Sequence, residues 1–169
     1  THFDHTRHLP LKGIRGQITS VPATPLSSQL NTILCGKGYI LPAHRGHHYL
    51  GATFKFHTSD VEVDDAEHGE NLAMLQQMAP ALYHALAGPH TEPRVSAGRA
   101  ALRCTSPDYL PLIGPIVDPS DFTAAWRALG HNAHLALTTP APWLPNLYVN
   151  TAHGTRGLVS APCLLYTSP

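Results

Sequence analysis

Residues 48–56, HYLGATFKF, alternate in character along the chain and point to the fold class. Leu50, Ala52, Phe54 and Phe56 fall on one face at a spacing of two. This period is typical of a strand with one buried face. We therefore expect a sheet in which these four residues face the core.

A second long strand is predicted at residues 94–104, RVSAGRAALRC. Its alternate residues divide between two faces, with Arg99, Ala101 and Arg103 on one and Ala100, Leu102 and Cys104 on the other. Shorter strands are expected at Gly16–Val21, Thr32–Cys35, Tyr39–Leu41, Leu112–Val117 and Leu147–Asn150. Segments 22–31 and 131–146 are rich in Pro, Ser, Thr and Asn, which predicts loops.

A long helix is predicted over Glu67–Leu86, where apolar residues keep helical spacing. Asp64 and Glu67 have the spacing of a capping box at its start. The dipeptide Gly88-Pro89 is a stop signal at its end.

A shorter helix is predicted after Asp118, which is a favourable cap, with Pro119 in its first turn. Phe122, Ala125, Trp126 and Leu129 form its apolar stripe before Gly130. Strand runs around one long helix indicate an α+β fold, an antiparallel sheet with helices on one face.

Composition restricts the functional classes. The chain has 169 residues, 43% hydrophobic and 13% charged, which is typical of a globular domain rather than a disordered one. Eleven basic residues balance eleven acidic ones, so any RNA partner must gain most of its phosphate contacts from other parts of the protein. No apolar run reaches the length of a membrane span, and we expect a cytoplasmic protein without membrane contact.

The cysteines and histidines predict no metal site. Cys35, Cys104 and Cys163 lack C-x-x-C spacing, which suits a reducing compartment. We expect Cys35 and Cys104 to pack in strands as small hydrophobic residues. Seven histidines show no paired ligand spacing and are interpreted as surface residues: His44, His47, His48, His57, His131, His134 and His153.

Known catalytic motifs are absent from the sequence: no G-x-G-x-x-G, P-loop, G-x-S-x-G or H-E-x-x-H occurs. We therefore assign no catalytic acid, base or nucleophile. The remaining candidates are arginines and glycines at strand ends. Arg103 ends a strand, and its planar guanidinium would clamp a carboxylate or pair with a neighbour such as Asp108.

The segment 148–162, YVNTAHGTRGLVSAP, runs from a strand through a small-residue turn into an apolar stretch. Gly154 and Gly157 would let backbone N–H groups approach a ligand. A helix beginning here would favour a partially negative group at its N-terminus. A turn with purely structural glycines is the alternative interpretation.

The order of LPLKGIRGQ, CGKGYILP, HHYLGATF, ENLAMLQQMAPAL, LRCTSPDYLPLIGP and LYVNTAHGTRGLVSAP resembles the substrate half of the glycine-oxidase and D-amino-acid-oxidase group of FAD-dependent oxidoreductases. Within that group the chain is most similar to the C-terminal oxidase domain of the bifunctional tRNA 5-methylaminomethyl-2-thiouridine biosynthesis family. The segments LRCTSPDYLPLIGP and GTRGLVSAP are the most specific. The resemblance covers residues 9–162.

The resemblance implies an FAD-dependent flavoprotein that oxidatively removes the carboxymethyl group, as glyoxylate, from 5-carboxymethylaminomethyl-(2-thio)uridine at the tRNA wobble position. Dioxygen would reoxidise the flavin. A separate N-terminal domain would then methylate the amine with S-adenosylmethionine. Such a reaction depends on orientation more than on a protein acid or base.

The resemblance also implies roles for particular residues. Arg103 would bind the substrate carboxylate, Tyr39 would help to hold it, and Arg156 would line the site. A second group would contact the cofactor, with Gly16 and Gln17 near a domain junction: Gly154, Thr155, Arg156, Gly157, Leu158, Gly16 and Gln17.

The resemblance is that of a fragment. The Rossmann-type FAD half and the methyltransferase domain are missing, and both are expected elsewhere in the same polypeptide. We expect residues 9–150 to form the substrate domain and 151–162 to begin the FAD-contacting segment. Residues 163–169, CLLYTSP, match a translated sequencing adapter and are expected to be a non-native tail.

Two other functions remain open from sequence. The chain could be part of a glycine-oxidase-like or D-amino-acid-oxidase-like enzyme that acts on small amino acids and shares the arginine and tyrosine positions. It could also be a binding module without catalysis that has kept only the sheet.

Overall fold

The computed structural model describes residues 3–88 and 90–167. The chain divides into two compact units. The sheet unit is Gly13–Leu102, and the hairpin unit is Thr1–Lys12 with Arg103–Pro169. Each unit is described separately.

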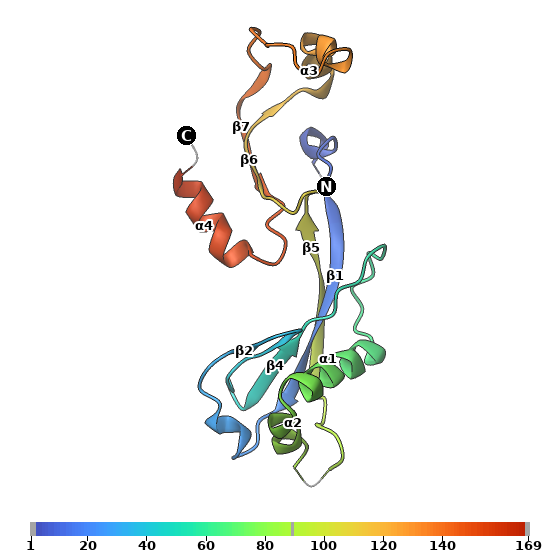
Figure 1. The fold of residues 1–169 in the computed structure, drawn as a ribbon, viewed down its shortest axis with the longest axis vertical. Helices are drawn as coiled ribbons and strands as arrows, with labels where there is room; N and C mark the ends of the chain where they lie inside the picture. Colours follow the sequence, from blue (N-terminus) through green and yellow to red (C-terminus); the bar gives the residue numbers. More distant parts are fainter. Residues whose placement is uncertain (1–2, 89, 168–169) are drawn as a thin grey trace. The chain divides into compact units, whose positions relative to one another are not determined.

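The sheet unit is built on five strands in the order β2-β3-β4-β1-β5 (Figure 1). The strands are β1 (Lys12–Pro22), β2 (Leu34–Cys35), β3 (Tyr39–Ile40), β4 (His47–Gly51) and β5 (Ala97–Thr105). β4 is antiparallel to both β1 and β3, and β2 is antiparallel to β3. The predicted antiparallel sheet is confirmed, and β1 begins four residues earlier than expected.

The core of the sheet unit lies between this sheet and two helices, α1 (Asp65–Met78) and α2 (Pro80–Ala87). The buried cluster contains Val21, Ile40 and Leu50 from the strands, and Leu72, Leu75, Tyr83 and Leu86 from the helices. A short 3-10 helix, η2 (Ser27–Gln29), lies in the predicted loop 22–31. Burial of this apolar surface is the main force that holds the helices against the sheet.

The predicted single helix is two helices, so its continuity was wrongly predicted. Pro80 has no N–H and disfavours helical geometry at the preceding residue. Ala79 accordingly has φ −144° and ψ 70°, and α2 restarts with Pro80 in its first turn. The stop at Gly88 is confirmed, while Pro89 lies outside the described residues.

The start of α1 is capped as expected, but only on one side. The Asp64 carboxylate accepts a hydrogen bond from the Ala66 N–H, at 2.9 Å. Glu67 does not complete a capping box, because its carboxylate binds Arg15 in β1 and Thr53, which follows β4. The Asp64 N–H instead donates to the Gln17 side chain at 2.8 Å.

The prediction that Leu50, Ala52, Phe54 and Phe56 share one buried face holds for Leu50 but is wrong for Phe54 and Phe56. Ile18 pairs with Gly51, whereas Arg15 pairs with Lys55, so three steps along β1 correspond to four on the returning chain. One extra residue exchanges the two faces of a strand. Leu50 is buried, but Phe54 and Phe56 are 44% and 52% exposed.

The hairpin unit contains an antiparallel pair, β6 (Leu112–Val117) and β7 (Trp143–Thr151). Between them lie α3 (Pro119–Ala125) and η3 (Arg127–Gly130), followed by a loop (Figure 1). The Asp118 side chain accepts hydrogen bonds from the N–H groups of Ser120 and Asp121, which confirms the predicted cap. The unit also contains η1 (Asp4–Thr6) and α4 (Gly157–Thr167), the helix anticipated after the glycine turn.

Candidate functional site

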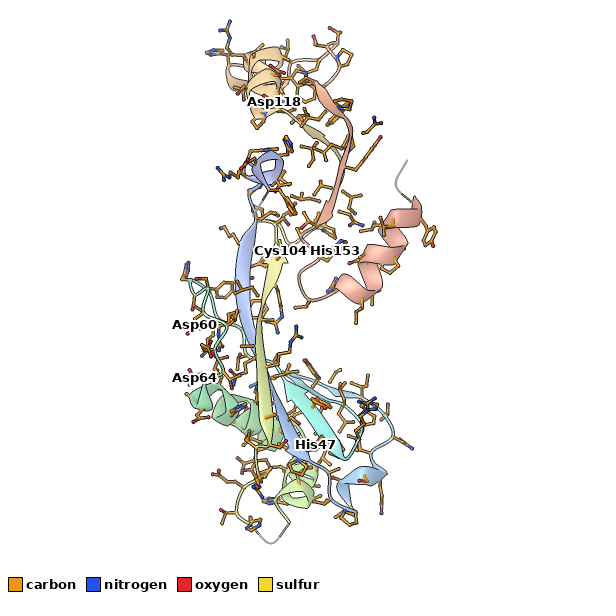
Figure 2. The ribbon with its side chains drawn as sticks, turned by 180° about the vertical axis from the view of Figure 1, so that it is seen from behind. His47, Asp60, Asp64, Cys104, Asp118 and His153 are labelled. Atoms are coloured by element: carbon orange, nitrogen blue, oxygen red, sulfur yellow. The ribbon has the colours of Figure 1, made fainter. Side chains whose placement is uncertain are left out.

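The end of β5 and the turn before α4 lie side by side in the hairpin unit. The Gly154 N–H donates to the carbonyl oxygen of Cys104 at 2.8 Å, and Thr105 forms a β-bridge with His153. Figure 2 labels Cys104 and His153 at this junction. Arg103 directly precedes Cys104 and is half-buried. The structure therefore brings the predicted Arg103 and Gly154 segments together.

The turn itself needs a glycine. Gly154 has φ +57°, a conformation that residues with a Cβ adopt rarely. A Cβ built there would lie 3.3 Å from Cγ2 of Thr105, closer than side chains usually approach. The turn is thus built for a close approach to β5, and α4 begins three residues later at Gly157.

Backbone N–H groups of this turn are available for a ligand. The hydrogen bonds of the turn within the described residues use the N–H groups of Gly154, Arg156, Val159 and Ser160. Those of Thr155, Gly157 and Leu158 have no acceptor in the described part of the chain. Such groups at a helix start favour a partially negative partner.

The side chains of the same turn face outward. Arg156 and Thr155 are exposed, and Leu158 is 98% exposed. Because the guanidinium of Arg156 is exposed, it can bind an anionic group without a large desolvation cost.

The other predicted site residues belong to the sheet unit. Tyr39 is half-buried in β3, and Gly16 is buried in β1. Gln17 is fully buried, and its amide binds both backbone groups of Asp64: Nε2 donates to the carbonyl oxygen at 2.7 Å and Oε1 accepts from the N–H. Within the sheet unit the Gln17 side chain anchors the start of α1. A cofactor contact for Gly16 and Gln17 stays a prediction.

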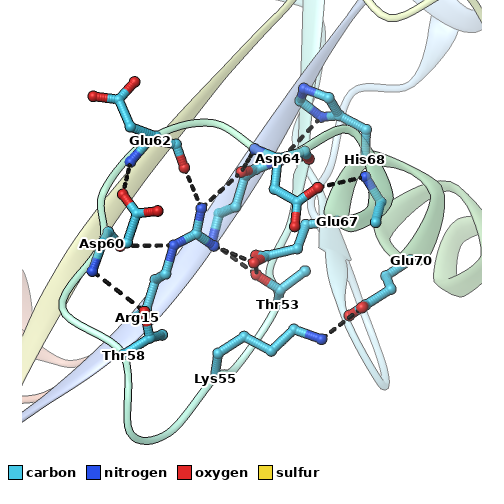
Figure 3. Close-up of polar contacts among 12 residues, drawn as sticks. Arg15, Thr53, Lys55, Thr58, Asp60, Glu62, Asp64, Glu67, His68 and Glu70 are labelled. Atoms are coloured by element: carbon cyan, nitrogen blue, oxygen red, sulfur yellow. Dashed lines mark hydrogen bonds and ion pairs between the residues drawn. The ribbon is translucent and has the colours of Figure 1, made fainter.

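A buried polar network around Arg15 was not predicted from the sequence (Figure 3). Arg15 is 3% exposed and forms an ion pair with Glu67, which also accepts from the Thr53 hydroxyl. Its guanidinium further donates to the carbonyl oxygens of Asp60 and Glu62. Little in the sequence points to this network, because Arg15 lies just outside the strand predicted at Gly16–Val21 and its partners are distant in the chain.

An open cavity of about 610 Å³ lies beside this network in the sheet unit. Its lining includes Arg15, Lys55, Asp60, Glu62 and Glu67. Lys55 forms an ion pair with Glu70 at 2.6 Å, and this hydrogen bond raises the pKa of the ammonium group. Arg15 and Lys55, the cations in this lining, are thus each paired with a carboxylate inside the unit.

The cysteine prediction was wrong, because Cys35 and Cys104 are both exposed. The physical reason is their place in the sheet: β2 and β5 are its two edge strands. Cys104 Sγ lies 3.7 Å from the Thr151 hydroxyl.

The surface interpretation of the histidines was wrong for His48, which is fully buried. Its Nδ1 lies 2.8 Å from the Leu41 carbonyl oxygen and its Nε2 lies 3.0 Å from the Ser27 hydroxyl. Strand alternation in β4 turns His48 inward. No cluster of metal-ligating side chains occurs among the described residues.

The turn after β5 is held by Asp108. The Ser106 hydroxyl and the Leu110 N–H hydrogen-bond its carboxylate, at 2.8 and 3.1 Å, and together lower its pKa. This turn follows Arg103 directly in the chain and leads into β6.

A sequence model of the DAO family, described as FAD dependent oxidoreductase, matches residues 2–164. The chain belongs to this family of FAD-dependent oxidoreductases. The amides of Thr155, Gly157 and Leu158, which have no acceptor among the described residues, are donors of the kind that bind a partially negative group of such a cofactor. The sequence lacks the glycine-rich loop that would hold its pyrophosphate.

Two bacterial proteins called "tRNA 5-methylaminomethyl-2-thiouridine biosynthesis bifunctional protein MnmC" are similar to this chain. The one from Chromobacterium violaceum is 59% identical over 160 residues, which is 95% of this chain and 24% of that protein. The one from Stutzerimonas stutzeri is 51% identical over the same shares. The chain thus spans about a quarter of the length of these relatives.

Two solved structures share the fold. Glycine oxidase from Geobacillus kaustophilus has a TM-score of 0.63 and 20% identity, and the match covers 92% of this chain and 33% of that chain. Glycine oxidase from Bacillus cereus has a TM-score of 0.61 and 21% identity, and the match covers 90% of this chain and 33% of that chain. The predicted α+β fold is thereby confirmed. No helix among the described residues has the length and apolarity to cross a membrane.

Proposed function

We propose that this chain is part of a longer FAD-dependent enzyme that removes a carboxymethyl group from the wobble uridine of tRNA. The substrate is 5-carboxymethylaminomethyl-(2-thio)uridine, and the carboxymethyl group leaves as glyoxylate. The observation that carries the proposal is 59% identity over 95% of the chain to a protein named for tRNA 5-methylaminomethyl-2-thiouridine biosynthesis. A tRNA substrate assigns the enzyme to the cytoplasm.

The substrate group is a glycine attached through its nitrogen, so its recognition depends on a carboxylate. Arg103 binds that carboxylate with two parallel hydrogen bonds, and Tyr39 and Arg156 assist. The position of Arg103 on a strand supports this role, because its Cα is fixed by the β-sheet. Water hydrolyses the oxidised carbon–nitrogen bond of the substrate, which gives glyoxylate and the aminomethyl group.

FAD, when bound, would supply the two-electron oxidant for the glycine carbon, with dioxygen as the final electron acceptor. Residues 154–158 and Gly16-Gln17 would hold the cofactor. The amides of Thr155, Gly157 and Leu158 have no acceptor among the described residues, which supports a ligand at this turn. The chain needs no acid or base of its own, because orientation supplies most of the catalysis.

The domain assignment follows from this function. Residues 9–150 form the substrate domain, 151–162 begin the FAD-contacting segment, and 163–169 are a tail derived from an adapter. The FAD-binding half and a methyltransferase domain that uses S-adenosylmethionine lie elsewhere in the polypeptide. The short match of the chain to its relatives, about a quarter of their length, supports this division.

A small-molecule amino-acid oxidase is the second candidate function. The shared fold with glycine oxidases favours it, but only at 20% identity. A binding module without catalysis is the third, and none of the contacts at the turn favours it over an oxidase.

The proposal is tested with the full-length polypeptide that contains this chain. The purified enzyme is incubated aerobically with tRNA carrying 5-carboxymethylaminomethyl-2-thiouridine, and in parallel with free glycine. We expect glyoxylate release and conversion of the nucleoside by mass spectrometry on tRNA only. Turnover of glycine alone would support the second candidate, and a flavin-loaded protein inactive on both substrates would contradict the proposal.

A further inference from the structure

The side chain of His153 links the two elements on either side of the glycine turn. Its Nε2 lies 2.6 Å from Oδ1 of Asn150 in β7, and its Nδ1 lies 2.8 Å from the hydroxyl of Ser160 in α4. Both ring nitrogens are thus engaged inside the hairpin unit. The residue is half-buried, which limits competition from water.

The contact with Ser160 continues into the backbone of the turn. The Ser160 hydroxyl donates to the carbonyl oxygen of Arg156 at 2.8 Å. The Arg156 N–H in turn donates to the carbonyl oxygen of His153 at 3.0 Å. His153, Arg156 and Ser160 therefore form a closed loop of hydrogen bonds around the first turn of α4.

The backbone of His153 fixes the same turn to the strand that carries Arg103. The bridge to Thr105 and the hydrogen bond from Gly154 to Cys104 hold the turn against β5. The side chain of His153 then contacts Ser160 in α4, the helix that follows this turn. The side chain and the backbone of His153 thus both contact the segment that carries the amides of Thr155, Gly157 and Leu158.

We propose that His153 is the positioning residue of the flavin-binding turn: through Ser160 it holds the amides that face the cofactor. This inference rests on the proposed function, because it takes the turn to lie against FAD. Fixed N–H groups favour negative charge on a bound group, so their position affects both the affinity and the reduction potential of the flavin.

The test uses the full-length flavoprotein with His153→Ala, and His134→Ala as the matched control. His134 is an exposed histidine in the loop of the same unit. Flavin affinity and midpoint potential are measured by titration, and folding by thermal melting. We expect His153→Ala to bind FAD about tenfold more weakly, because the turn loses its hydrogen-bonded link through Ser160. We also expect a lower midpoint potential in the flavin that remains bound.

Two conservative variants separate positioning from simple structural support. His153→Asn keeps a hydrogen-bonding atom at the place of Nδ1, facing Ser160, whereas His153→Gln keeps one near Nε2, facing Asn150. Positioning through Ser160 predicts that Asn restores the potential and Gln does not. Ser160→Ala, which leaves His153 in place, should shift the potential in the same direction as His153→Ala.

The outcomes of the test are distinct. If the unsubstituted full-length protein binds no flavin, the proposed function fails. If it binds flavin and His153→Ala keeps both its affinity and its potential, the positioning role fails while the proposed function stands. Equal rescue by Asn and Gln would also overturn the role assigned to Ser160.

Discussion

Arg15 illustrates how one residue can organise a surface loop. Its guanidinium is buried and binds a carboxylate from α1 and two carbonyl oxygens from the segment 60–62. A charged side chain is stable in such a place only when all its donors are matched. Loss of one partner should therefore cost far more than the loss of a surface ion pair.

We predict that Glu67→Ala lowers the free energy of unfolding by about 3–5 kcal/mol, because it leaves Arg15 buried without its counter-charge. The measurement is urea unfolding followed by circular dichroism. Glu70→Ala is the control. Glu70 lies in the same helix as Glu67, and its exposed carboxylate pairs with Lys55, so its loss should change the urea midpoint of unfolding little. Equal effects of both substitutions would contradict the role of the Arg15 network.

The lowered pKa of Asp108 predicts how stability depends on pH. Its pKa lies below the ordinary value of 3.8, first because of the hydrogen bond from the Ser106 hydroxyl. A lowered pKa means that the ionised carboxylate contributes stability above pH 3.8, which is lost as the pH falls through the folded-state pKa. We expect Ser106→Ala to raise the pKa toward 3.8 in a carbon-13 NMR titration of the carboxyl group. An unchanged pKa would contradict the assigned cause.

At the scale of elements, most strands and both helix starts could be predicted from the sequence. Period-two alternation located β5, and the cap of Asp118 located α3, because both signals are local. Pro80 was also a local signal, for a break in the helix. The prediction gave more weight to the apolar stripe that continues on both sides of Pro80. The exposed faces of Phe54 and Phe56 depend on a register shift against β1, which no local pattern contains.

In the candidate site, too, local features could be predicted from the sequence and long-range contacts could not. The sequence located Arg103 and the glycine turn by residue type, and the structure brings their segments together through Cys104 and Gly154. The Arg15 network and the contacts of His153 are long-range pairings between elements. Spacing alone could not predict them.

The α3 cap gives a prediction at this scale. We expect Asp118→Ala to reduce stability by about 1 kcal/mol, because the N–H groups of Ser120 and Asp121 lose their acceptor. Asp118→Asn should restore most of it, since asparagine is an equivalent cap. Thermal melting of the two variants is the measurement, and similar losses in both would exclude capping as the cause.

For the molecule as a whole, the proposed function gives this chain only one edge of the cofactor site. The turn before α4 offers backbone amides, whereas the sequence contains no glycine-rich pyrophosphate loop. We therefore expect this chain alone to bind FAD weakly or not at all, so that the purified polypeptide is colourless. Flavin absorbance at a stoichiometric ratio in the isolated chain at neutral pH would contradict this division of the site.

Under the proposed function, Arg103 holds the carboxylate of a glycine group attached to tRNA. The most direct test is steady-state kinetics of full-length Arg103→Ala on tRNA carrying 5-carboxymethylaminomethyl-2-thiouridine, with Arg99→Ala in the same strand as control. We expect a loss of about 100-fold in kcat/KM, mainly through KM, with flavin content unchanged, as for removal of a charged hydrogen-bonded partner. Unchanged kcat/KM in Arg103→Ala would contradict it.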